Sequence, residues 1–308
     1  MELIRGLSNL RERHHGSVVS IGNFDGFHRG HQALVARLRE HARRMGLPTI
    51  VLTFEPTPRE YFSRGDAPGR VATFRDKLAQ LEAAGVDRVL CVRFGRSLAA
   101  MTAEQFVEDV LVGKLGAKAV LVGDDFRFGA NRAGDLALLQ RLGARHGFVA
   151  EALGTVEVAG GRASSSAVRA ALAEPDLSRV AQLLGRPYRL GGRVRRGLQL
   201  GRKLGMPTLN VVMRRRPALR FGVYAVRVRS GERIWDGVAS IGVRPTLMKS
   251  NCLLEAHLFG MSEQLYGALV EVEFVKFLRP EQRFEDLDAL AVQMQKDGDQ
   301  AQAWLKGA

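Results

Sequence analysis

Short apolar segments alternate with amphipathic ones over roughly the first 180 residues, and this alternation constrains the fold most. Continuous apolar runs predict strands at 17–21, 49–54, 88–92 and 119–122. Helical spacing of apolar residues predicts helices at 32–45, 73–84, 102–115 and 135–146. Apolar strands that alternate with helices are typical of a parallel sheet covered on both faces. Such a sheet binds ligands at the carboxyl ends of its strands.

The pattern changes after about residue 185. Short β-like runs separated by Gly and Pro follow, at 191–195, 224–228, 235–241, 253–258 and 269–274. They predict a small antiparallel barrel or sandwich, with a final helix at 286–305 packed on its outside. We therefore expect an α/β protein of two domains, 1–185 and 186–308, in keeping with its 308 residues.

Charge and cysteine content limit the partners and the compartment. The chain has 46 Lys and Arg against 32 Asp and Glu, a net charge of +14, which favours anionic partners. Cys91 and Cys252 are too few for a disulfide framework, so a reducing compartment is expected. The apolar runs are shorter than the roughly 20 residues of a membrane helix, and the N-terminus shows no signal peptide. We expect a cytoplasmic protein without a membrane partner.

The segment GNFDGFHRGH, residues 22–31, follows the first strand and opens the first helix. His28 and His31 would share a helix N-terminus, where free N–H groups bind phosphate and imidazoles can stabilise a transferring phosphoryl group. A solvated pair of histidines is the alternative interpretation. The segment resembles the HxGH signature of the nucleotidyltransferase superfamily, which implies a Rossmann-like domain and transfer of a nucleoside monophosphate. The ATP-binding residues implied are Gly22, Phe24, Asp25, Gly26, His28 and His31.

A second segment, SSSAVR at 164–169, resembles the ISSTxIR segment of the same family. Its hydroxyls would cap a helix, and its arginine, one turn on, would hold the β- and γ-phosphates of ATP. Taken alone, a serine run is more often a loop with a cap. The residues implied are Ser164, Ser165, Ser166 and Arg169.

Two segments at strand ends narrow the family. FEPTP at 54–58 resembles F-[DE]-P-H-P of bacterial FAD synthetases, and GDDFRFG at 123–129 resembles their G-x-[DN]-F-x-F-G. This resemblance implies that Phe128 packs on the isoalloxazine ring of FMN and that Asp124 or Asp125 holds a ribityl or ribose hydroxyl. Thr57 stands where the family has His, which removes one expected contact to the FMN phosphate. The flavin-binding residues implied are Pro56, Pro58, Asp124, Asp125 and Phe128.

Residues 186–220 hold eleven Arg or Lys and no acidic residue. A charge run is usually a solvated face, but GRVRRGLQLGRKLGMPTLN at 192–210 resembles the GxVxxGxxxGRxxGFPTAN motif of riboflavin kinases. By this resemblance a glycine-rich loop covers the ATP phosphates, and Thr208 with Asn210 coordinates Mg²⁺. The ATP-binding residues implied are Gly197, Gly201, Arg202, Gly205, Pro207, Thr208 and Asn210.

Later segments match the kinase family in order: 221–226, 237–246, 254–258, 265–267 and 277–281. Strand alternation puts Glu255 and His257 on one face. Glu255 is then the expected catalytic acceptor of the proton from the ribityl hydroxyl; the alternative is a surface glutamate on an edge strand. Arg279 and Glu281 are either a simple ion pair or the rim of the flavin pocket. The flavin-binding residues implied are Arg244, Glu255, Arg279 and Glu281.

The resemblance covers nearly the whole chain and implies a bacterial bifunctional riboflavin kinase and FMN adenylyltransferase. Such a protein uses ATP, riboflavin and FMN, needs Mg²⁺, and can self-associate; no nucleic acid is expected. Four departures from the motifs, at Arg196, Met206, Leu209 and Gly260, remove no expected ligand and should only tune affinity. The alternatives are a nucleic-acid-binding protein, favoured by the charge, a protein that has lost one activity, and a flavin sensor without turnover.

Overall fold

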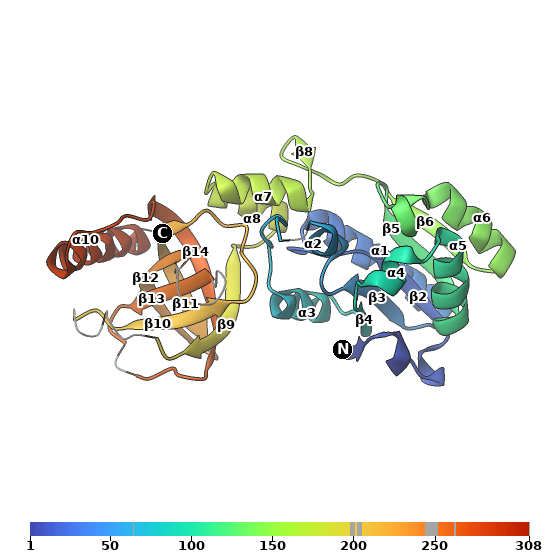
Figure 1. The fold of residues 1–308 in the computed structure, drawn as a ribbon, viewed down its shortest axis with the longest axis horizontal. Coiled ribbons are helices and arrows are strands. Elements are labelled where there is room, and N and C mark those ends of the chain that lie inside the picture. The colour runs from blue at the N-terminus through green and yellow to red at the C-terminus, as the bar shows by residue number, and fades with distance from the viewer. Residues whose placement is uncertain (64, 198–200, 202–204, 244–251, 262, 308) are drawn as a thin grey trace. The chain divides into compact units, whose positions relative to one another are not determined.

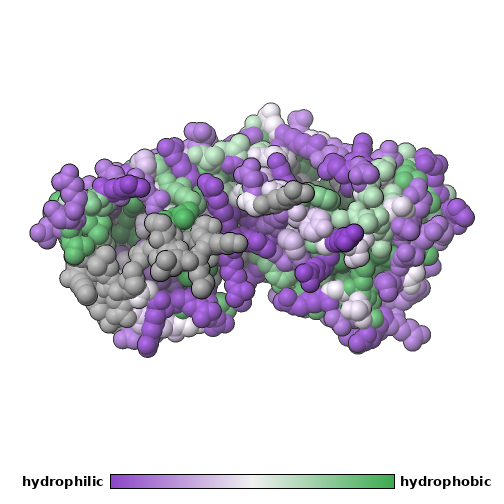
Figure 2. Space-filling view, in the orientation of Figure 1, coloured by the Kyte–Doolittle hydropathy of each residue, from purple (hydrophilic) through white to green (hydrophobic). Residues whose placement is uncertain are grey.

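The computed structural model describes the chain except for residues 64, 198–200, 202–204, 244–251, 262 and 308 (Figure 1). Its contacts divide the chain into two compact units. The first consists of Met1–Pro68 and Lys77–Ser164, and the second of Gly69–Asp76 and Ser165–Ala308. Hydrophilic residues cover most of the face seen in Figure 2, as the net charge of +14 leads one to expect.

The first unit contains a six-stranded sheet in the order β1-β4-β3-β2-β5-β6, with all pairs parallel. Its strands are β1 (Glu2–Arg5), β2 (Ser17–Ile21), β3 (Thr49–Phe54), β4 (Arg88–Val92), β5 (Ala117–Gly123) and β6 (Val149–Leu153). The predicted parallel sheet is confirmed. The sequence did not predict β1 and β6, which form the two edges, because an edge strand is less covered and its sequence is less apolar.

Helices cover both faces of this sheet (Figure 1). Val18 packs with residues of α1 (Arg29–Met45) and α3 (Phe74–Ala83), whereas the neighbouring Val19 packs with residues of η3 (Phe106–Lys114) and α6 (Leu136–His146). The remaining elements are short: η1 (Leu7–Asn9), η2 (Glu12–His14), α2 (Pro58–Phe62), α4 (Arg96–Ala100), α5 (Ala103–Gln105), η4 (Ala130–Arg132), β7 (Glu157–Val158) and β8 (Gly161–Arg162).

The helix expected at 102–115 differs in its winding. Only α5 is α-helical, and η3 is a π-helix. Its buried residues are Phe106, Val107, Val110 and Leu111. These lie four and five positions apart, which suits the wider turn of a π-helix better than that of an α-helix.

The second unit contains a closed antiparallel barrel in the order β10-β13-β12-β11-β14-β9. Its strands are β9 (Arg189–Arg195), β10 (Thr208–Met213), β11 (Gly222–Ser230), β12 (Arg233–Val243), β13 (Cys252–Leu258) and β14 (Leu269–Arg279). The barrel is confirmed and the sandwich is excluded. The prediction missed β10, because the glycines and charges of 186–220 hide its apolar residues.

Three helices complete the second unit. The predicted final helix is α10 (Leu287–Lys306), whose Ala301 and Leu305 pack against barrel residues such as Val223 and Val238. Helices α7 (Ser165–Ala173) and α8 (Leu177–Leu184) precede the barrel, and the Leu172 carbonyl of α7 accepts a hydrogen bond from Arg220 N at 3.0 Å. In the described part of the chain, no helix is both long and apolar enough to cross a membrane.

Candidate active sites

The two histidines of the HxGH segment meet at the start of α1. His28 is the N-cap, and its ring stacks on that of His31 with 3.7 Å between centroids. Gly30 makes this possible, because a Cβ there would lie 3.1 Å from the Ala163 carbonyl oxygen and 3.2 Å from the His28 ring. Both imidazoles therefore lie at the N-terminus of a helix, beside the carboxyl end of β2, where a phosphate would be bound.

The loop before these histidines holds backbone strain. Phe24 and Phe27 have positive φ angles of 48° and 44°, and both side chains are buried. Their rings contact His31, at centroid distances of 5.0 and 6.5 Å. A left-handed conformation costs a non-glycine residue about 1–3 kcal/mol. The surrounding core sustains that cost, so the loop is fixed before any nucleotide arrives.

His31 lies in a low-polarity environment. Burial lowers its pKa well below the usual value, and the nearby His28 and Lys77 lower that pKa further. Its Nδ1 atom is buried and has no hydrogen-bond partner within the described ranges. His31 is therefore neutral near pH 7, and a neutral imidazole presents one N–H donor to an anion.

The residues predicted to bind flavin in this unit lie in different surroundings. Pro56 follows a cis peptide bond, and Pro58 begins α2. Asp124 accepts hydrogen bonds from Thr155 Oγ1 at 2.5 Å and Arg162 Nη2 at 2.6 Å, and these contacts lower its pKa. Asp125 is exposed, 3.2 Å from the same guanidinium.

Phe128 and Thr57 also have structural roles. Phe128 is 8% exposed and stacks on Phe126 within the core, so its ring offers little area to a ligand. Thr57 caps α2: its hydroxyl accepts from Glu60 N, and its own N donates to Glu60 Oε2 at 2.8 Å. The residue at the family's histidine position thus serves the helix start.

An exposed aromatic cluster lies close to these prolines and was missed in the sequence. Tyr61 and Phe62 of α2 lie 5.5 and 5.7 Å from Phe94, which also contacts Phe54 at 5.8 Å. Phe62 is 64% exposed, a high value for a large apolar ring. The signal available was the pair Tyr61-Phe62, which directly follows the FEPTP motif and has no apolar periodicity that would bury it.

The serine segment lies at the start of α7. Ser165 and Ser166 form its first turn, with Ser164 directly before it. Arg169, one turn on, donates from Nε to the Gly69 carbonyl oxygen at 2.8 Å. Their contact with ATP phosphates stays a prediction.

A cavity of about 260 Å³ lies in the second unit and has apolar walls with a few polar groups. Five residues predicted from the sequence line it: Gly201, Thr208, Glu255, Arg279 and Glu281. The other lining residues are Met206, Val223, Val238, Ala239, Ser240, His257, Gln282, Phe284, Leu290, Met294 and Asp297. This composition is typical of a small-molecule site.

Strand register brings the expected catalytic groups of this cavity together. Glu255 on β13 is the register partner of Asn210 on β10, and His257 is the partner of Thr208. The burial of β13 alternates residue by residue, so Glu255 and His257 share the less buried face. His257 Nδ1 donates to the Pro207 carbonyl oxygen at 2.9 Å, which links the end of the glycine-rich segment to the strand that carries Glu255.

Asn210 is suited to hold a cation. It is 5% exposed, and its Nδ2 donates to the Thr208 carbonyl oxygen at 3.3 Å. Its Oδ1 atom is buried without a hydrogen-bond partner among the described residues. A Cβ at Gly197 would overlap this amide, so the glycine leaves room there. An unpartnered carbonyl-type oxygen beside a hydroxyl fits a hard divalent cation.

Arg279 does not pair with Glu281. It forms a bidentate ion pair with Asp297 of α10, with N–O distances of 2.7 and 2.6 Å. Glu281 lies over Gly242, and burial raises its pKa. Gly205 has a φ of 76°, which favours glycine. The predicted residues Arg202 and Arg244 lie outside the described residues.

Two family models match the chain. The FAD synthetase model covers residues 10–167, and the riboflavin kinase model covers residues 184–305. The chain belongs to the bifunctional riboflavin kinase/FMN adenylyltransferase family. The enzyme uses ATP to phosphorylate riboflavin in its C-terminal domain and to adenylylate FMN in its N-terminal domain.

Relatives match over nearly their whole length. The bifunctional riboflavin kinase/FMN adenylyltransferases of Pseudomonas fluorescens and Escherichia coli K12 are each 48% identical, with 96% of both chains covered. A crystal structure titled as a macrolide-efflux protein from Streptococcus pneumoniae has a TM-score of 0.78 and 26% identity, covering 96% of this chain and 97% of its own. The efflux role belongs to that title; the likeness supports the fold.

Proposed function

We propose that riboflavin is phosphorylated in the cavity of the second unit and that Glu255, Thr208 and Asn210 carry the reaction. The observation that supports this most is the buried, unpartnered Oδ1 of Asn210, on the strand position paired with Glu255. Thr208 and Asn210 would hold the divalent cation, which we propose is Mg²⁺. When bound, this cation would neutralise charge on the β- and γ-phosphates.

Glu255 would take the proton in the kinase step. The ribityl 5′-oxygen of riboflavin forms a bond to the γ-phosphorus of ATP, and the bond from that phosphorus to the β–γ bridging oxygen breaks. ADP leaves with those electrons, and the hydroxyl proton passes to the Glu255 carboxylate. The apolar wall of the cavity, which includes Met206, Phe284 and Leu290, would hold the isoalloxazine ring and exclude water.

We propose that adenylyl transfer takes place at His28 and His31. A phosphate oxygen of FMN bonds to the α-phosphorus of ATP, and the bond to the α–β bridging oxygen breaks to release pyrophosphate. The FMN phosphate is already ionised, so no general base is needed. The two imidazoles and the N–H groups that begin α1 would donate to the phosphoryl oxygens as negative charge grows on them.

The flavin ring of FMN would pack on the exposed aromatic cluster of Tyr61, Phe62 and Phe94. This cluster offers open ring area beside Pro56 and Pro58, whereas Phe128 is buried in the core. Asp125, exposed near the end of β5, remains available for a ribityl or ribose hydroxyl. We also propose a cytoplasmic location, where ATP is supplied, and leave self-association as a prediction for sedimentation analysis.

The double variant His28→Ala/His31→Ala tests this assignment. We expect it to abolish FAD formation and to leave FMN formation intact, because the kinase residues belong to the other unit. The measurement incubates protein with riboflavin, ATP and Mg²⁺ and separates the flavins by chromatography. A folded double variant that loses both products would contradict separate sites, and one that still makes FAD would remove the histidines from the reaction.

A further inference from the structure

Lys77 is a buried cation in the first unit that no motif explains. It lies on α3, and it and Leu81, four residues on, are the buried residues of that helix. Leu81 belongs to the apolar core, but Lys77 is only 2% exposed and carries an ammonium group. A buried lysine is rare and costs free energy compared with an apolar side chain. Its presence on the core face of α3 therefore calls for a role beyond stability.

A hydrogen-bonded path leads from Lys77 to the HxGH loop. Lys77 Nζ donates to Thr53 Oγ1, near the end of β3, at 3.4 Å. Thr53 Oγ1 in turn donates to the Asn23 carbonyl oxygen, also at 3.4 Å. Asn23 directly precedes Phe24, the first of the two residues with positive φ. Lys77 thus reaches the strained end of the loop.

The charge of Lys77 also acts on His31. The titratable and charged groups that act on this imidazole are His28, on the same turn, and Lys77, on α3. Both lower the pKa of His31, and burial, the largest cause, lowers it too. Lys77 therefore supports the neutral form of the histidine as well as the shape of its loop.

We propose that Lys77 is a positioning residue for adenylyl transfer: through the Thr53 hydroxyl, its ammonium holds the loop that presents His28 and His31. The inference rests on the assignment of adenylyl transfer to these histidines. It adds a residue from α3 to a site otherwise built by β2, α1 and their loop. It also explains why the core-facing side of α3 retains a polar end.

Lys77→Met tests the proposal, with Lys118→Met as the matched control because Lys118 is exposed on β5 of the same unit. We expect kcat/KM for FAD formation to fall roughly tenfold to a hundredfold in Lys77→Met, since small displacements of catalytic groups cost that much. FMN formation should stay within about twofold of wild type, because Lys77 does not touch the kinase site. The Lys118→Met control should match wild type in both reactions.

Histidine titration separates positioning from a general loss of structure. In Lys77→Met the pKa of His31 should rise toward its usual value, so the imidazole becomes protonated at higher pH than in wild type. NMR of histidine-labelled protein measures this, with the His31 resonance assigned from a His31→Gln variant. Thr53→Val should lower FAD formation but leave the pKa of His31 unchanged, because it keeps the charge and removes the link.

Lys77→Gln serves where the methionine variant does not fold, as judged by thermal unfolding. It keeps a donor toward Thr53 without the charge, so it should retain more FAD formation than Lys77→Met while the pKa of His31 still rises. The proposal is overturned if a folded Lys77 variant forms FAD at the rate of Lys118→Met with an unchanged His31 titration. FAD formation that survives His28→Ala/His31→Ala overturns the site assignment itself, which is a separate outcome.

Discussion

Glu255 faces the kinase cavity because a β-strand repeats every two residues. Its neighbours Leu254 and Ala256 are buried inside the barrel, so the carboxylate lies on the opposite face with His257. Gly30 is a second single residue on which a site depends, since it lets the rings of His28 and His31 stack. In both cases one position fixes the direction of a reacting group.

Glu255→Gln should reduce FMN formation by on the order of a hundredfold or more, because the amide cannot accept the ribityl proton. FAD formation from supplied FMN should not change. The matched control is Glu232→Gln, a change at an exposed position in the turn between β11 and β12. Steady-state rates with riboflavin and with FMN measure the two steps, and an unaltered FMN rate in the Glu255→Gln variant would remove this carboxylate from the mechanism.

Helix α10 is attached to the barrel by a buried ion pair as well as by apolar contacts. Arg279 ends β14 and holds Asp297 of the helix with two hydrogen bonds, and Gln293 Nε2 donates to the same carboxylate at 2.9 Å. The two side chains are only 18% and 5% exposed. Because Arg279 and Asp297 also line the cavity, this pair couples the docking of an element to the shape of the flavin site.

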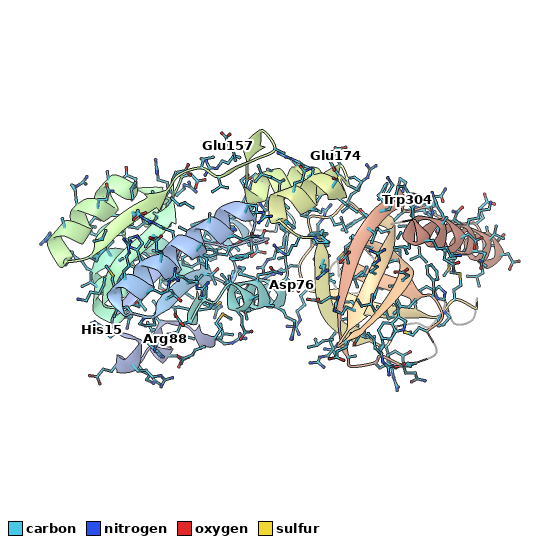
Figure 3. All side chains as sticks on the ribbon, turned by 180° about the vertical axis from the view of Figure 1, so that it is seen from behind. His15, Asp76, Arg88, Glu157, Glu174 and Trp304 are labelled. Atoms are coloured by element: carbon cyan, nitrogen blue, oxygen red, sulfur yellow. The ribbon has the colours of Figure 1, made fainter. Side chains whose placement is uncertain are left out.

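Asp297→Ala should destabilise the second unit by about 3–5 kcal/mol, the usual effect of leaving a buried charge unpaired. The KM for riboflavin should rise as well, because Arg279 loses its fixed orientation. The comparison is Asp299→Ala, an exposed position on the same helix. Urea unfolding followed by tryptophan fluorescence measures the stability, since Trp304 lies on α10 (Figure 3); equal stability of the two variants would show that the ion pair contributes little.

At the scale of the whole molecule, the chain does not pass from one unit to the other only once. Segment Gly69–Asp76 belongs to the second unit, although both of its flanks belong to the first. Arg70 N donates to the Arg216 carbonyl oxygen at 2.9 Å, and Ala218 N donates to the Arg70 carbonyl oxygen at 2.8 Å. Asp76, labelled in Figure 3, accepts from Gly191 N of β9 at 3.4 Å. The domain limits 1–185 and 186–308 therefore stay a proposal about sequence, and contacts group the chain differently.

Asp76 should make the stability of the second unit depend on pH. Burial raises its pKa in the folded state, although hydrogen bonds from Thr73 and Gly191 oppose the rise. A carboxyl with a raised folded-state pKa stabilises the fold at low pH, and this contribution is lost as pH rises through that pKa. Asp76→Asn should remove this dependence.

Urea unfolding of wild type and Asp76→Asn across the acidic range measures the effect. The difference in unfolding free energy should move in favour of Asp76→Asn as pH increases. A difference that stays constant with pH would show that burial does not govern this carboxyl.

The sequence alone determined the parallel sheet, the barrel, the final helix and most motif residues of both sites. Local periodicity carries that information: apolar runs of period two or 3.6 reflect burial of each element, and the spacings of His28–His31 and Thr208–Asn210 are fixed along one helix start and one strand. Edge strands β1 and β6 and the hidden apolar pattern of β10 escaped because their local sequences are weakly apolar or highly charged.

Only the tertiary structure decided which distant residues meet. The cluster of Tyr61, Phe62 and Phe94, the pairing of Arg279 with Asp297, and the burial of Lys77 beneath the HxGH loop join segments far apart in sequence. No local pattern records such contacts, because they depend on how strands are ordered in the sheet and how helices pack on it. A lysine on α3 looks like any surface lysine until that packing places it in the core.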